Sequence, residues 1–234
     1  MIFSKEEIEE GQLLLIDKPL EWTSFDVVNK IRYSIKRAYG FKKIKVGHAG
    51  TLDPLATGLL IIAVGRKTKT INDLMGLPKT YTGTFKLGET TPSYDAETEV
   101  NQNFPWDHIN EELINQARES FLGEQDQIPP IFSAIKKDGK KAYESAREGT
   151  VIEMQPRKIT IMDFQVWSKS PQELDFSVSC SKGTYIRSLA HDFGQAVQSG
   201  AYLTALRRTA IGNFKIEDAL SLDQYLSSLN LSGF

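Results

Sequence analysis

Two short, continuous apolar runs limit the fold most strongly, residues 12–16 (QLLLI) and 59–65 (LLIIAVG). Runs of this length are typical of strands that are covered on both faces, although a buried helix gives the same pattern. Neither run approaches the roughly 18 residues that a membrane-spanning helix needs. The N-terminus (MIFSKEEIEEG) lacks the basic start and apolar stretch of a secretory signal. We therefore expect a cytoplasmic protein with a layered core and no membrane association.

A helix is expected between the two runs. Apolar residues recur there at helical spacing, at Phe25, Val28, Ile31 and Ile35. Thr23 or Ser24 can act as its N-cap and Gly40 can end it. Further along, residues 80–87 alternate, which predicts a half-buried strand with one inner face formed by Tyr81, Phe85 and Leu87.

The remaining pattern predicts strands at residues 157–167 and 173–180. Asp107 can cap a helix whose inner residues are Ile109, Leu113, Ala117 and Phe121. Two more helices are expected, one after Gly183 and one near residues 217–229. Strands and helices interleave irregularly, so the fold class is α/β or α+β with a mixed sheet. No linker is visible, and we expect one domain over residues 1–234.

The composition argues against disulfide and zinc scaffolds. Cys180 is the only cysteine and cannot form an internal disulfide. No cluster of Cys and His offers a structural zinc site. With 40% hydrophobic and 25% charged residues, the 234-residue chain has the composition of a folded globular protein.

Charge is distributed unevenly, although the formal net charge is only −2. Residues 30–45 contain cations and no carboxylate, which makes this segment a candidate contact for a polyanion. Residues 87–135 are strongly acidic, and lysines return at residues 136–141. An alternative is that each cluster is only a solvated surface.

The densest chemical signal is residues 47–58 (GHAGTLDPLATG). Its glycines permit unusual backbone angles and close approach of a ligand, and Pro54 restricts Asp53 to extended conformations. Asp53 would lie on a stiff loop directly before a buried strand, where catalytic side chains are often presented. The alternative is an aspartate that caps its own turn. His48 in the same segment is a weaker candidate.

A second signal is residues 182–187 (KGTYIR). If Thr184 caps the helix, Arg187 takes the third helical position, where its cation opposes the helix dipole. An arginine in that position could instead hold a catalytic carboxylate ionised. The alternative is an ordinary surface arginine.

Seven ordered motifs together resemble the TruB-type tRNA pseudouridine synthases. They are KP at 18–19 with WTS at 22–24, GHAGTLDPLATG at 47–58, KTY at 79–81, DAE at 95–97, PP at 129–130 with Ser133, Ala134 and Lys136, GTYIR at 183–187, and LRRT at 206–209. The resemblance implies the pseudouridine synthase fold, with a central, largely antiparallel mixed sheet flanked by helices and loops. It implies no cofactor and no metal.

The resemblance also implies roles for individual residues. Asp53 would be the catalytic aspartate, Tyr81 would stack on the target uracil, and Arg187 would pair with the aspartate. His48 would lie near the extracted nucleotide, and Asp95 would help to arrange it. The remaining substrate-binding candidates are Lys18, Lys136, Tyr185 and Arg208.

The implied substrate is uridine 55 in the T-loop (T-arm) of tRNA. Many members of the family carry a C-terminal PUA domain, and we expect none here, because only about 25 residues follow Thr209. We expect a monomer without an obligate protein partner. Asp53 could act as nucleophile at C1′ or as base at C2′. Two other classes remain open, a non-catalytic RNA-binding protein and a glycosidase or hydrolase.

Overall fold

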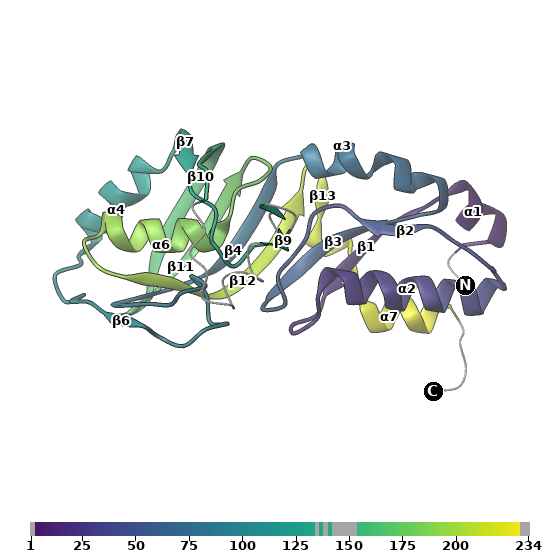
Figure 1. The fold of residues 1–234 in the computed structure, drawn as a ribbon, viewed down its shortest axis with the longest axis horizontal. Helices are drawn as coiled ribbons and strands as arrows, with labels where there is room; N and C mark the ends of the chain where they lie inside the picture. The colour runs from purple at the N-terminus through teal and green to yellow at the C-terminus, as the bar shows by residue number, and fades with distance from the viewer. Residues whose placement is uncertain (1–2, 134–135, 138–139, 142–153, 230–234) are drawn as a thin grey trace. The chain divides into compact units, whose positions relative to one another are not determined.

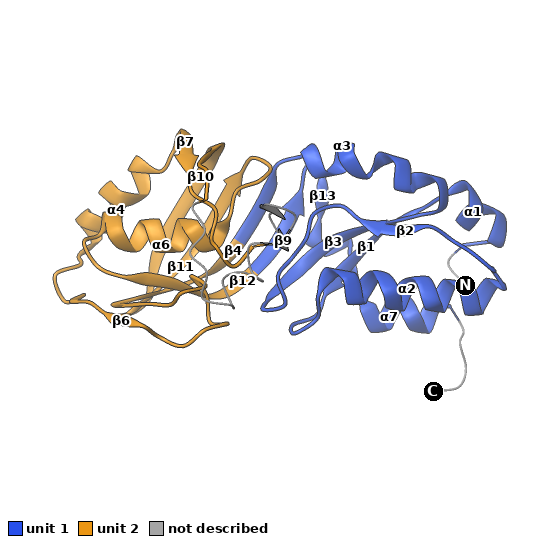
Figure 2. Cartoon of the chain, viewed as in Figure 1, with its two compact units in different colours: residues 1–81, 207–234 blue, residues 82–206 orange. Residues whose placement is uncertain are grey.

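The computed structural model describes residues 3–133, 136–137, 140–141 and 154–229. The chain divides into two compact units, residues 1–81 with 207–234, and residues 82–206 (Figure 2). Each unit contains strands covered by helices, and the fold is a mixed α/β architecture as predicted (Figure 1).

Unit 1 is built from both ends of the chain. Its strands are β1 (Leu13–Lys18), β2 (Val46–His48), β3 (Ala56–Val64), β13 (Phe214–Lys215) and β14 (Leu220–Ser221). Its helices are α1 (Lys5–Glu10), α2 (Ser24–Tyr39), α3 (Ile71–Gly76) and α7 (Leu222–Ser228), with 3₁₀ turns η1 (Gly65–Thr70) and η2 (Ile216–Asp218).

The main strands of unit 2 are β7 (Gly123–Gln127), β10 (Arg157–Ser170) and β11 (Glu173–Cys180). Two pairs of short strands accompany them, β5 (Glu89–Thr90) with β6 (Gln102–Asn103) and β8 (Lys136–Lys137) with β9 (Lys140–Lys141). The helices of this unit are α4 (Glu111–Ser120) and α6 (Ile186–Ala196). Two long strands, β4 (Lys79–Leu87) and β12 (Ala201–Ile211), contribute residues to both units.

The sheet is mixed and largely antiparallel. In unit 1 the order is β14-β1-β3-β12, and in unit 2 it is β4-β11-β10-β7. β1 pairs antiparallel with β3, from Leu13 opposite Ala63 to Lys18 opposite Gly58, and parallel with β14. β10 pairs antiparallel with both β7 and β11. This confirms the predicted sheet class.

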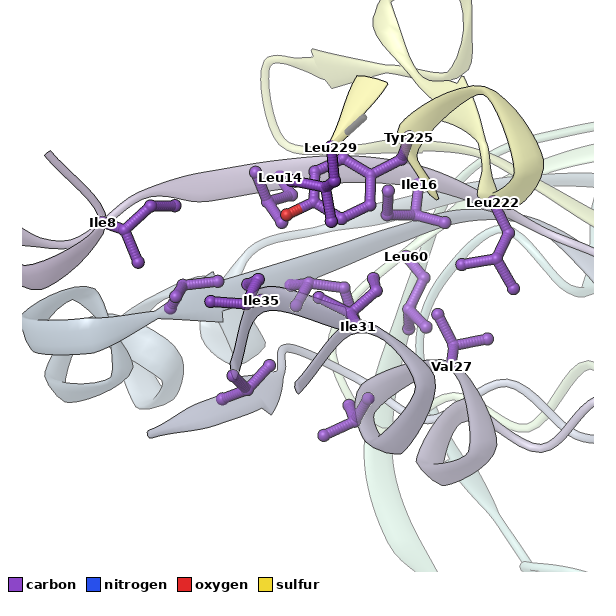
Figure 3. Packing of buried hydrophobic residues seen from close by; sticks show 14 of the residues in the cluster. Ile8, Leu14, Ile16, Val27, Ile31, Ile35, Leu60, Leu222, Tyr225 and Leu229 are labelled. Carbon is purple, nitrogen blue, oxygen red and sulfur yellow. The ribbon is translucent and has the colours of Figure 1, made fainter. Parts of the chain in front are cut away.

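The predicted strands at residues 59–65, 80–87 and 173–180 are all present. β3 is buried along nearly its whole length, which fits its continuous apolar sequence. In unit 1 the residues around β1 and β3 pack against α2 and α7, and Figure 3 shows Ile16, Leu60, Ile31 and Tyr225 within this core. In unit 2, Phe85 of β4 stacks on Phe176 of β11 at 4.2 Å between ring centroids.

The helix α2 has the predicted ends. The Thr23 hydroxyl accepts a hydrogen bond from the Asp26 N–H in a capping box, and Gly40 ends the helix in the left-handed region. The predicted inner stripe was wrong in one residue, because Phe25 is 61% exposed while Val27 is fully buried. A stripe that begins at Val27 fits the same spacing.

The predicted starts of three other helices were wrong. The helix α4 is capped by Asn110, whose side chain accepts from the Leu113 N–H, and not by Asp107. The helix α6 has Tyr185 as N-cap, so Arg187 takes the second helical position. The last helix begins only at Leu222, because residues 216–221 form a 3₁₀ turn and a short strand.

Of the glycines near Asp53, Gly58 is the least able to accept a side chain, because the backbone of Arg208 lies against it. Its φ is +104°, and a Cβ there would lie 2.3 Å from the carbonyl oxygen of Arg208. We expect Gly58→Ala to lower the free energy of unfolding by about 3 kcal/mol or more. Gly40→Ala is the matched control, since Gly40 also has positive φ but no atom within 4 Å. Gly40→Ala should lower the free energy of unfolding by about 1 kcal/mol. Equal losses for the two variants in urea denaturation would contradict a steric role of Gly58.

Candidate active site

Asp53 lies in the loop between β2 and β3 and is half-buried. The backbone on both sides of it is held by side chains from distant parts of unit 1. The hydroxyl of Ser24 accepts from the Leu52 N–H at 2.8 Å and donates to the Leu52 carbonyl at 3.1 Å. Both backbone groups of the residue before Asp53 are thus fixed to the first turn of α2.

Lys18 holds the other side of the loop. It ends β1 on the same face as Leu14 and Ile16, so its side chain enters the core and is fully buried. Its ammonium donates to the carbonyls of Trp22 at 2.6 Å, Pro19 at 2.9 Å and Pro54 at 3.4 Å. Burial lowers the pKa of Lys18 to about 8, against the opposing effect of the Asp53 charge.

Arg208 is the third side chain that holds this loop, and it is 1% exposed. We call Ser24, Lys18 and Arg208 the clamps of the Asp53 loop. Its guanidinium donates to the carbonyls of Leu59 at 2.8 Å, Gly50 at 3.0 Å and Thr51 at 3.5 Å. Both Lys18 and Arg208 were predicted to bind substrate, and that contact stays a prediction. Their hydrogen bonds give Lys18 and Arg208 a positioning function, because they fix the loop that carries Asp53.

His48 and Tyr81 are the other candidates in unit 1. His48 ends β2 and is half-buried, and its pKa is lowered by burial and by the positive charge of Arg208. We therefore expect a neutral imidazole at pH 7. Tyr81 lies in β4 and is 8% exposed, which confirms its inward direction. Its stacking on a uracil stays a prediction.

In unit 2, Arg187 is not a surface residue. Its Nε lies 3.6 Å from Oδ2 of Asp95, and the two side chains are only 6% and 7% exposed. Its Nη1 also donates to the carbonyl of Ser93 at 3.3 Å. The cation at the start of α6 is therefore compensated by a buried carboxylate. The predicted pair of Arg187 with Asp53 joins residues of different units, and it stays a prediction.

Tyr185 and Lys136 complete the predicted set. Gln127 anchors the backbone of Tyr185 in both directions, accepting from its N–H at 2.8 Å and donating to its carbonyl at 3.0 Å. The Arg157 guanidinium lies 5.2 Å from the centre of the Tyr185 ring. Lys136 belongs to the short strand β8, and its side chain lies outside the described part of the chain.

The basic segment at residues 30–45 keeps most of its cations at the surface of unit 1. The exposed ones are Lys36, Arg37, Lys42, Lys43 and Lys45. Arg32 is used internally instead, donating to the Val46 carbonyl at 3.0 Å and to Asn29 at 2.9 Å. The exposed lysines suit contacts with phosphates. No helix among the described residues is long and apolar enough to span a membrane.

One carboxyl on α6 gives a pH-dependent prediction. Burial raises the pKa of Asp192 to about 6, so the folded state holds this proton more tightly than the unfolded state does. The resulting stabilisation is present below about pH 4 and is lost as the pH rises through 6. We expect Asp192→Asn to raise the free energy of unfolding at pH 7 by about 1–2 kcal/mol, allowing for partial exposure. Urea denaturation at pH 4 should show little change, and an equal gain at both pH values would contradict the assignment.

The fold places the chain in a known class. It superimposes on "Crystal Structure of a Cbf5-Nop10-Gar1 Complex" with a TM-score of 0.71 and 28% identity, covering 95% of this chain and 55% of that one. A second solved structure, an H/ACA RNP bound to a substrate RNA containing 2′-deoxyuridine, gives a TM-score of 0.67 and 27% identity over 94% of this chain and 53% of that one. The chain thus spans about half the length of these proteins and has the pseudouridine synthase fold.

Sequence comparison then gives the family. The model of the TruB family pseudouridylate synthase N-terminal domain matches residues 36–186, and that of the tRNA pseudouridylate synthase B C-terminal domain matches residues 187–231. A tRNA pseudouridine synthase B of Flavobacterium johnsoniae is 58% identical, covering 96% of this chain and 98% of that protein. A tRNA pseudouridine synthase B of Phocaeicola vulgatus is 51% identical, covering 93% of this chain and 92% of that protein. The chain belongs to the TruB family of pseudouridine synthases, which are isomerases.

Proposed function

We propose that the protein converts uridine 55 in the T-loop of tRNA to pseudouridine, with Asp53 as the catalytic carboxylate and without cofactor or metal. The observation that carries the proposal is the loop of Asp53, held through the backbone of residues 50, 51, 52 and 54 by buried side chains. Such rigid placement suits a group that must meet one ribose carbon.

The reaction conserves atoms. The N1–C1′ glycosidic bond breaks, the uracil turns while bound, and C5 bonds to C1′; the proton lost from C5 is replaced by one taken up at N1. The sugar becomes positive and the base negative on the way, so an ionised carboxylate can act as nucleophile at C1′ or as base at C2′. Arg187 is proposed to keep Asp53 ionised, as a nearby guanidinium favours the charged form.

The uridine must leave its stack before it reacts. Extrusion of a loop base costs roughly a few kcal/mol, and an aromatic platform such as Tyr81 can return about 1–3 kcal/mol by stacking. The exposed cations of residues 30–45 are proposed to contact RNA phosphates, so binding should weaken steeply with salt. We propose that residues 1–234 act as one catalytic domain and as a monomer. We also propose a cytoplasmic location, because the single cysteine, Cys180, cannot form an internal disulfide.

The test is to incubate the purified chain with unmodified tRNA and with an isolated T-arm hairpin, and to map pseudouridine to single nucleotides. One modified position in the T-loop is expected. A product elsewhere would overturn the substrate but keep the reaction class. Release of free uracil would overturn the reaction class, because a hydrolase leaves an abasic site.

A further inference from the structure

The start of α6 is weak by itself, although it carries Arg187. Tyr185 occupies the N-cap, a position in which Ser, Thr, Asp and Asn are favoured because their side chains accept from the helix. Arg187 takes the second helical position, where a cation faces the positive end of the helix dipole. Groups from outside α6 must therefore fix this turn, and with it the backbone from which the Arg187 side chain starts.

Gln127 supplies the main attachment. It is only 3% exposed. Its Oε1 accepts from the Tyr185 N–H at 2.8 Å, and its Nε2 donates to the Tyr185 carbonyl at 3.0 Å. An amide side chain can do both at once, because it has one acceptor and one donor group. A single side chain thus pairs with both backbone groups of the N-cap, as a neighbouring strand would.

Two further contacts tie the same turn to the same part of unit 2. Ser188 donates from its Oγ to the carbonyl of Ile128 at 2.7 Å. The Arg157 guanidinium lies 5.2 Å from the centre of the Tyr185 ring, and Arg157 is the partner of Gln127 in the register of β7 and β10. The backbone of Gln127 is itself held in the sheet, so the start of α6 lies where the end of β7 fixes it.

This turn sets one end of the Arg187 side chain, and other residues set the opposite end. The guanidinium lies 3.6 Å from Oδ2 of Asp95 and donates to the Ser93 carbonyl at 3.3 Å. A shift of the helix start therefore pulls the guanidinium out of its contacts or tilts it. Misplacement of a group in an active site by about 1 Å can cost on the order of 100-fold in rate.

We propose that Gln127 is a positioning residue of the isomerisation and that it acts through Arg187. The inference rests on the proposed function, in which the Arg187 guanidinium keeps Asp53 ionised. Gln127 needs no contact with RNA for this, because it is buried and both polar groups of its amide bind Tyr185. Its loss should lower the rate of the chemical step and leave the affinity for tRNA unchanged.

The experiment measures the single-turnover rate of pseudouridine formation at saturating unmodified tRNA, and the dissociation constant by filter binding. Gln127→Met keeps the length of the side chain and removes both hydrogen bonds. It should lower the rate by about 10–100-fold at unchanged affinity. Gln125→Met is the matched control in the same strand, because Gln125 likewise donates to a carbonyl, that of Phe121 at the end of α4. It should change neither value.

A double-mutant cycle with Arg187→Lys tests the route. Lysine keeps a cation beside Asp95 but lacks the planar guanidinium. If Gln127 acts through Arg187, Gln127→Met should cost less than about threefold in the Arg187→Lys background, because coupled residues are not additive. Ser188→Ala removes only the hydrogen bond to Ile128 and is a milder probe of the same turn. It should lower the rate less than Gln127→Met does, with the same dependence on Arg187.

Rate losses that multiply in the double variant would overturn the inference, as would an equal loss in Gln125→Met or a loss confined to affinity. If Gln127→Met fails to fold in urea denaturation, Ser188→Ala decides by the same criteria. An Arg187→Lys variant as fast as the wild type would overturn the inference and leave the catalytic function of Asp53 in place. A wild type that binds tRNA but forms no pseudouridine would overturn the proposed function itself.

Discussion

Asp53→Asn is expected to abolish pseudouridine formation while tRNA binding stays within a few-fold of the wild type. The amide has nearly the same shape as the carboxylate, so the clamps on residues 50, 52 and 54 remain. It can act neither as nucleophile nor as general base, and the rate should fall by at least about 10²–10⁴-fold. Release of tritium from C5 of labelled uridine measures the rate, and filter binding measures the affinity.

Asp73→Asn is the matched control, because Asp73 is an exposed carboxylate of unit 1 in the first turn of α3. It should leave the rate unchanged. Full activity of Asp53→Asn would identify a different catalytic group. If the wild type bound tRNA without any tritium release, the protein would be an RNA-binding protein and not an enzyme.

Arg187→Met is expected to cause a large loss of stability in unit 2. The substitution leaves Asp95 buried without its cation, and breaking a buried ion pair on one side typically costs about 3–5 kcal/mol. It should also reduce isomerisation if Arg187 keeps Asp53 ionised. Urea denaturation measures the first effect and tritium release the second.

The double variant Asp95→Asn with Arg187→Met separates these effects. It removes the uncompensated charge, so most of the stability should return while activity stays low. Lys158→Met is the surface control, because Lys158 is 67% exposed beside Glu124 and Asp126 and should contribute less than about 1 kcal/mol. A stable and fully active Arg187→Met would contradict both proposed functions of the guanidinium.

The main strands and α2 could be predicted because their signals are local. Continuous apolar residues in β3, alternation in β4 and the Thr23 and Gly40 caps each lie within a few residues. Phe25 shows the limit of this reasoning. Being apolar does not make a residue buried, and the stripe of α2 is defined by what packs on it, not by which side chain is largest.

Helix starts were harder to predict because several residues in a row can act as caps. Asp107 and Asn110 both have suitable oxygens, and only Asn110 accepts a hydrogen bond at the start of α4. Thr184 looks like a cap but donates to the Ser181 carbonyl instead. The start of α6 is set by Gln127, which is 58 residues away and binds both backbone groups of Tyr185.

The stiffness of the Asp53 loop could be predicted, but not what makes it stiff. Glycines and Pro54 indicate restricted geometry, whereas the clamps come from Ser24, Lys18 and Arg208 at separations of 28, 36 and 158 residues. Ser24 was not among the predicted site residues. Its only signal was its place in the WTS motif, since no local rule pairs a helix-start hydroxyl with a distant loop.

Unit 1 uses both ends of the chain, and this has a consequence for its synthesis. Ile16 and Leu60 obtain part of their cover from Leu222 and Tyr225, which leave the ribosome last. Residues 82–206 form a continuous segment and can fold earlier. Apolar surface of the first 81 residues therefore stays uncovered through most of translation, and nascent chains that stall near residue 206 should be prominent targets of chaperones and proteases.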